Sequence, residues 1–264
     1  MSLNRSRRAR PLSPGFRIAR LFGIDIVIDA TWLISVVLFS VVTYDLIGDE
    51  FDGSVTGLPA YVLAFLFTLP LYASIVVHEI AHSLVARAYR MPVRRIVLFL
   101  FGGVSQIERE APSPAAEYNV ALAGPLVSLL LAATFGLLAR LLNPDISGFL
   151  GIFGLVATIN LALAAFNLIP AFPMDGGRIL RSALWRGTAD RYRATRWASR
   201  IGALIAGGFV ALGVGLFVNA AVGSGHHSDG LWIALLGLFL YNAAQAAGRA
   251  EGGDRPNAPP PPEF

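Results

Sequence analysis

The residues best suited to chemistry in this 264-residue chain are His78, Glu79 and His82, in the sequence His-Glu-Ile-Ala-His. Residues four apart share one face of an α-helix, so both imidazoles can reach the same metal ion. Glu79 is offset by about 100° around the helix, which suits a group facing a metal's water. Histidines that only pack inside the protein are the alternative. Ionisable groups in an apolar segment are costly and usually functional, which favours a metal site.

A third protein ligand is expected elsewhere, because catalytic zinc sites use three protein ligands and leave a position for water. Asp175 is the preferred candidate. It ends the sequence Asn-Leu-Ile-Pro-Ala-Phe-Pro-Met-Asp of residues 167–175, where prolines break the helix and let the carboxylate turn inward. The alternative role of Asp175 is an N-cap for the helix that follows. Other acidic candidates by residue type lie in a charged loop: Glu108, Glu110 and Glu117.

The composition indicates an integral membrane protein. Hydrophobic residues make up 55% of the chain and charged residues 14%, and the mean hydropathy is +0.61. A soluble domain has about a quarter charged residues, so this chain lacks the charge for a water-exposed surface. The absence of cysteine excludes disulfides and thiolate metal sites.

Six apolar segments are long enough to cross a bilayer, which takes about 20 residues. Their approximate bounds are 28–44, 59–86, 118–142, 149–170, 198–221 and 230–247. With the N-terminus in the cytoplasm, every arginine except Arg140 falls on the cytoplasmic side, which predicts cytoplasmic N- and C-termini. This bias also accounts for the net charge of +4 without a nucleic-acid partner. In the fifth segment, small residues four apart favour close helix packing: Gly207, Ala211 and Gly215.

Two segments predict strands. Residues 16–28 alternate around a Phe22–Gly23 turn, and residues 94–108 predict two strands joined at Gly102–Gly103. Non-helical backbone at membrane depth needs cover from protein or a water-filled cavity. We therefore expect an all-α polytopic membrane protein, with six transmembrane helices and a small membrane-dipping β-sheet near the cytoplasmic side. Ordinary interfacial loops are the alternative to the sheet.

The predicted organisation has three parts. Residues 1–15 form a basic flexible N-terminus, residues 16–250 the six-span domain, and residues 251–264 a disordered Pro-rich tail. No cleavable signal peptide follows the first basic cluster. The tail fits either a natural end of the chain or a linker to a further domain.

Four motifs together resemble the site-2 protease family of intramembrane metalloproteases (peptidase M50). They are HEIAH in an apolar segment, FGG in the predicted hairpin, AEYNVALAGP and NLIPAFPMDGGR. The bacterial branch that resembles the sporulation sigma-factor-processing protease fits best, and the resemblance covers about residues 16–247. Many members of that branch carry a C-terminal pair of CBS modules. This sequence has only a Pro-rich stretch there, so regulation by nucleotide is not inferred.

The resemblance implies a zinc metalloendopeptidase of the bacterial cytoplasmic membrane. It implies one Zn²⁺ bound by His78, His82 and Asp175, with Glu79 as general base and Asn167 in substrate positioning. The implied substrate is a membrane-anchored protein, such as an anti-sigma or pro-sigma factor. The sequence assigns neither the substrate nor the oligomeric state.

Two other functions predict different sequences. A transporter predicts inverted repeats between the two halves, and no convincing repeat is found. A zinc-binding membrane scaffold without hydrolytic activity predicts loss of the glutamate, whereas Glu79 is present.

Overall fold

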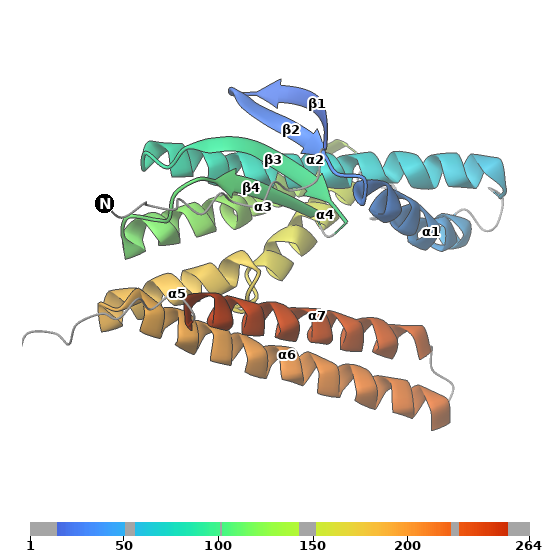
Figure 1. Ribbon diagram of the computed structural model, residues 1–264. Helices are drawn as coiled ribbons and strands as arrows, with labels where there is room; N and C mark the ends of the chain where they lie inside the picture. Colours follow the sequence, from blue (N-terminus) through green and yellow to red (C-terminus); the bar gives the residue numbers. More distant parts are fainter. Residues whose placement is uncertain (1–14, 51–55, 101, 143–151, 223–226, 253–264) are drawn as a thin grey trace, which may run out of the picture.

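The computed structural model describes residues 15–50, 56–100, 102–142, 152–222 and 227–252. Almost all of the two predicted flexible ends, 1–15 and 251–264, lies outside these residues. Helices make up most of the described chain, and a small sheet lies beside the second helix (Figure 1).

Six of the described helices coincide with the predicted apolar segments, and α5 is an additional helix between the fourth and fifth segments. The helices are α1 (Trp32–Glu50), α2 (Leu58–Ala88), α3 (Pro114–Leu142), α4 (Ile152–Asn167), α5 (Asp175–Thr188), α6 (Arg191–Val222) and α7 (His227–Gly252). Four of them contain stretches that are long and apolar enough to cross a membrane, namely α2, α3, α6 and α7. The apolar runs of α1 and α4 are shorter within the described residues: Trp32–Val41 and Phe153–Asn167.

The sheet has four strands in the order β1-β2-β3-β4. Their bounds are Phe16–Leu21, Ile24–Ile28, Val93–Phe99 and Gly102–Ile107. The pairs β1–β2 and β3–β4 are antiparallel, and β2 and β3 are parallel. Both predicted hairpins are therefore confirmed, and a parallel pairing joins them into one sheet. Strand β4 is one of the two edges of this sheet.

The two hairpins use their glycines differently. Phe22 and Gly23 have φ values of 51° and 74°, as a two-residue type I′ turn requires. The predicted joint at Gly102–Gly103 is wrong in detail, because these residues begin β4 and the connection lies before them. A Cβ at Gly103 would lie 2.8 Å from Cγ of Glu79. This glycine therefore allows β4 to approach α2 closely.

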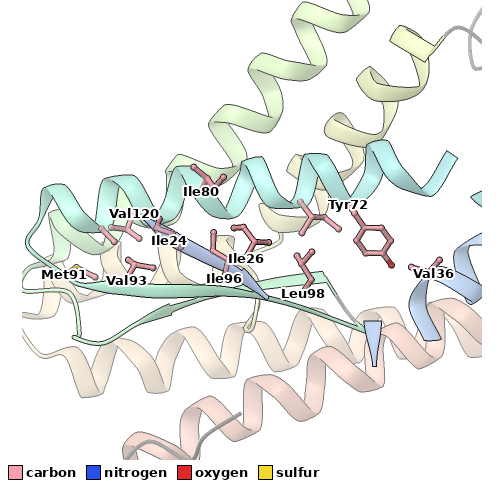
Figure 2. Close-up of a cluster of buried hydrophobic side chains, with 12 residues drawn as sticks. Ile24, Ile26, Val36, Tyr72, Ile80, Met91, Val93, Ile96, Leu98 and Val120 are labelled. Atoms are coloured by element: carbon pink, nitrogen blue, oxygen red, sulfur yellow. The ribbon is translucent and has the colours of Figure 1, made fainter. Parts of the chain in front are cut away.

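A cluster of buried apolar side chains fixes the sheet against α2 (Figure 2). It includes Ile24 and Ile26 of β2, Ile96 and Leu98 of β3, and Tyr72 and Ile80 of α2. Both β2 isoleucines are almost fully buried, at 0% and 1% exposed. Close packing of these side chains across the interface holds the sheet at one place along α2.

Helices α6 and α7 pack closely, but not through the predicted residues. A Cβ built at Gly207 or Gly215 meets no atom within 4 Å. The close approach uses other glycines: a Cβ at Gly213 would lie 2.6 Å from the Gly230 carbonyl oxygen, and one at Gly237 would lie 2.6 Å from the Val210 amide nitrogen. The four-residue spacing identified a face of small residues, but it did not determine which face meets the neighbouring helix.

Candidate metal centre

The structure brings His78, His82 and Asp175 together. The two histidines lie one turn apart on α2, with ring centroids 4.8 Å apart. Oδ2 of Asp175, the first residue of α5, lies 3.2 Å from Nε2 of His78 and 3.0 Å from Nε2 of His82. All three ligand atoms lie within 4.8 Å of one another. Two nitrogens and one carboxylate oxygen form the kind of donor set that catalytic zinc uses.

This cluster is shielded from solvent. His78 and His82 are each 3% exposed and Asp175 is 8% exposed. Burial by itself would raise the pKa of Asp175, but the hydrogen bonds and positive charges of the two imidazoles in their protonated form outweigh it and hold that pKa well below the ordinary carboxyl range. The carboxylate therefore stays ionised, and a buried ionised group requires a positive partner.

The tautomer of His82 indicates what kind of positive partner the Asp175 carboxylate requires. Nδ1 of His82 lies 2.6 Å from the Val120 carbonyl oxygen, which only accepts, so Nδ1 carries the proton. In a neutral imidazole Nε2 then presents a lone pair, and here it faces the Asp175 carboxylate. Two acceptors at this distance repel unless a cation or an additional proton lies between them. The donor set therefore fits a divalent metal.

Asp175 reaches the histidines because α4 stops early and α5 starts close by. The N-cap of α5 is Met174, with no capping hydrogen bond from a side chain. The alternative role of Asp175 as an N-cap is therefore wrong: it is the first helical residue, and its carboxylate is directed at α2. A Cβ at Gly176 would collide with the carbonyl oxygens of Leu168 and Ile169. The absence of a side chain at Gly176 lets the first turn of α5 pack directly on this loop.

Helix α3 holds both imidazoles from one face. The Val120 carbonyl accepts from His82, and Oγ of Ser128 lies 2.9 Å from Nδ1 of His78. Gly124 lies between them in sequence, and a Cβ there would collide with both rings. Hydrogen bonds at the second ring nitrogen fix the orientation and basicity of a metal-binding histidine. Sequence reasoning missed these residues, although their four-residue spacing in AEYNVALAGPLVS was a signal.

The carboxylate of Glu79 is held by the sheet. Its Oε2 accepts a hydrogen bond of 2.5 Å from the Ser105 hydroxyl, on edge strand β4. Ser83, one turn further along α2, donates to Ser105 over 3.0 Å. Glu79 thus lies next to His78 in sequence, but its carboxylate contacts the sheet, whereas the histidines contact α3. This arrangement keeps a further carboxylate beside the candidate metal ligands without adding it to their cluster.

Asn167 is less directly placed. It is the last residue of α4 and half-buried, and its Nδ2 donates to the Leu163 carbonyl oxygen over 2.9 Å. Within the described residues, no hydrogen bond joins Asn167 to the three clustered residues. Its part in substrate positioning stays a prediction.

The other acidic candidates for the third ligand have partners elsewhere. Each forms an ion pair with an arginine: Glu108 with Arg94, Glu110 with Arg191, and Glu117 with Arg181. None belongs to the cluster of possible metal ligands in the described part of the chain.

Comparison with known families agrees with this site. The sequence profile of Peptidase family M50 matches residues 66–145 and 143–209, a region that contains all three clustered residues. The chain belongs to peptidase family M50. Family membership and the four long apolar helices make it an integral membrane protein.

Individual relatives agree with the family. Rip3 of Mycobacterium tuberculosis, named as a zinc metalloprotease, is 39% identical over 226 residues, covering 83% of this chain and 55% of Rip3. A relative from Synechocystis named in the same way is 35% identical over 239 residues, or 90% of this chain and 61% of its own. The chain therefore spans less than two thirds of these relatives' length. The solved site-2 protease from Methanocaldococcus jannaschii matches with a TM-score of 0.58 and 28% identity, over 89% of this chain and 95% of that one.

Proposed function

We propose that this chain is an intramembrane zinc metalloendopeptidase that hydrolyses peptide bonds in or near the transmembrane segments of membrane-anchored proteins. The buried cluster of His78, His82 and Asp175 beside Glu79 carries the proposal. In a chain of peptidase family M50, these three residues would hold one zinc ion. The relatives named as zinc metalloproteases support this choice of metal.

The reaction would divide its work between the metal and Glu79. When bound, zinc supplies a Lewis acid that polarises the scissile carbonyl group and acidifies water. The Glu79 carboxylate takes the proton of the attacking water and then gives it to the leaving amine. The hydrogen bond from Ser105 to Oε2 holds the carboxylate in one orientation for this transfer. Asn167 donates the second N–H of its amide to the developing oxyanion or to the substrate backbone.

The edge strand β4 suits an extended substrate. A helical substrate shields its amides, so the segment to be cut has to unwind before it can be attacked. Strand β4 is the last strand in the sheet order, and its Ser105 contacts the catalytic carboxylate. A substrate segment that adds to this edge would run beside Glu79, with its backbone hydrogen bonds provided by β4.

The proposed topology has six spans, with both termini in the cytoplasm of a bacterium. Four helices meet the length for a span within the described residues, and α1 and α4 would complete the set. Helix α1 begins next to the middle of α2, where Trp32 and Tyr72 lie edge to face with centroids 5.0 Å apart.

A cleavage assay tests the function. The protein is co-expressed with a tagged, membrane-tethered candidate substrate, such as an anti-sigma or pro-sigma factor, as wild type and as Glu79→Gln. We expect the variant to retain zinc, measured by metal analysis of the purified protein, and to lose cleavage. Cleavage at the wild-type rate by Glu79→Gln contradicts the mechanism. Proteomics of membrane-bound fragments that accumulate in the variant strain would identify the substrate.

A further inference from the structure

Glu117 of α3 and Arg181 of α5 form a buried ion pair to which the proposed mechanism gives no role. Glu117 is 1% exposed, and the Arg181 side chain is 14% exposed. Nε of Arg181 donates to Oε1 of Glu117 over 2.7 Å, and Nη2 donates to the same oxygen. The desolvation of two charges offsets much of their attraction, so stability alone is a weak reason for a buried ion pair. Its position in the fold is more informative.

Arg181 contacts the chain on both sides of Asp175. It lies on the helix that begins with Asp175, six residues further on. Its guanidinium also stacks over the ring of Phe172, 5.3 Å from the centroid. Phe172 is buried, at 7% exposed, in the loop three residues before Asp175. The guanidinium therefore fixes both the loop that leads to the carboxylate and the helix that starts with it.

Glu117 lies on the face of α3 that holds the two imidazoles. This face consists of residues at positions i, i+3, i+7 and i+11, which follow one stripe of a helix. They are Glu117, Val120, Gly124 and Ser128. Val120 and Ser128 hydrogen-bond to the histidines, and Gly124 leaves room for their rings. One face of α3 thus holds His78 and His82 directly, and through Glu117 it holds the helix that carries the third candidate ligand.

We infer that the Glu117–Arg181 ion pair is a positioning device for Asp175. It sets α5 against α3, so that the carboxylate meets the two imidazoles that α3 orients. The inference rests on the metal centre of the proposed function. It assigns Glu117 and Arg181 no contact with substrate or metal.

Zinc affinity measures this positioning directly. The dissociation constant is determined on the purified, detergent-solubilised protein by competition with a chelator. Glu117→Gln keeps the shape of the side chain and removes its charge, and we expect it to raise the zinc Kd by about 10- to 100-fold, as for other residues that support metal ligands. Arg181→Lys keeps the charge but loses the planar fork, and we expect a smaller increase. The matched control is Glu110→Gln, which removes the charge from an ion pair with Arg191 at the surface, where the Glu110 side chain is 76% exposed. This control should leave the zinc Kd unchanged.

Two further measurements separate positioning from a merely structural role. The absorption spectrum of the cobalt-substituted protein should change in Glu117→Gln and not in Glu110→Gln, since it reports the ligand geometry. In an Asp175→Asn background, Glu117→Gln should have no further effect on the zinc Kd, because the carboxylate it positions is gone.

A purely structural pair gives the opposite pattern. In that case, loss of the pair destabilises the zinc-free and the zinc-loaded protein equally. The Tm of both forms falls, and the zinc Kd stays unchanged. That result, with an unchanged cobalt spectrum, overturns the inference. If Glu117→Gln does not fold, the same measurements on Arg181→Lys decide.

The test is independent of proteolysis. One outcome is that the variants show the Glu117–Asp175 coupling in zinc binding while the wild-type protein cuts no membrane-tethered substrate. This outcome contradicts the proposed function and supports the positioning pair. Cleavage that depends on Glu79 together with a zinc Kd insensitive to Glu117 supports the function and overturns the pair.

Discussion

The helices around the metal centre and the α6–α7 pair are held together by different forces. Helices α6 and α7 approach through glycines, and their outer faces expose large apolar side chains such as Leu204 and Leu238, at 77% and 51%. Around the metal centre, polar side chains are buried and joined across helices. Nδ2 of Asn160 on α4 donates to Oγ of Ser74 on α2 over 2.8 Å, and Ser128 of α3 contacts His78.

This difference separates two requirements of a membrane protein that holds a buried polar site. The α6–α7 pair needs small residues where the backbones meet and apolar ones elsewhere, because packing drives helix association in lipid. The metal centre needs particular atoms at particular places, since each buried polar group requires its partner. Glycine is used in both regions, so glycine substitutions compare them directly.

The largest effect is expected for Gly124→Ala in the metal centre. The added Cβ would lie 2.5 Å from Nε2 of His78 and closer still to Nε2 of His82. Because the rings have to move, we expect the zinc Kd to rise by up to about 100-fold, in line with overpacking costs of about 1–3 kcal/mol. Chelator competition measures the change. Gly207→Ala in α6 is the matched control, because a Cβ there meets no atom within 4 Å. A Kd for Gly124→Ala equal to that of the control would show that the centre tolerates displacement.

An intermediate effect is expected for Ser128→Ala. The substitution removes the hydroxyl that lies 2.9 Å from Nδ1 of His78 and leaves the backbone unchanged. Loss of such a partner typically weakens metal binding by about 10- to 100-fold, and we expect the lower end because His78 keeps its packing. Ser128→Thr retains the hydroxyl and should recover part of the affinity. Full zinc affinity in Ser128→Ala would mean that packing alone orients His78.

The smallest effect on the metal is expected for Gly213→Ala in α6. The new Cβ would lie 2.6 Å from the Gly230 carbonyl oxygen, so the two helices have to separate. We expect the free energy of unfolding to fall by about 1–3 kcal/mol, which thermal unfolding in detergent measures. The zinc Kd should stay unchanged. A large change in zinc affinity would show that the α6–α7 pair and the metal centre are coupled, and the comparison between them would fail.

Local patterns in the sequence predicted much of the fold. The alternation in residues 16–28 predicted the first hairpin, and the long apolar segments predicted the helices. The details that failed depend on contacts between distant parts of the chain. The Gly102–Gly103 pair was interpreted as a turn. In the structure, Gly103 lies in β4, where a side chain would collide with Glu79. Gly207 and Gly215 were chosen for helix packing, although the neighbouring helix lies on another face.

For the candidate site, the sequence by itself determined the chemistry of the donors. Two histidines one helical turn apart share a face in any helix, and an acidic residue after a proline-rich break was the best available third ligand. Only the tertiary structure decided that Asp175 comes within 3.2 Å of both imidazoles. It alone revealed the face of α3 that orients the histidines and the Glu117–Arg181 pair that ties α5 to it. The physical reason is that helical periodicity is local, whereas the relative placement of helices depends on packing and buried polar contacts along their whole length.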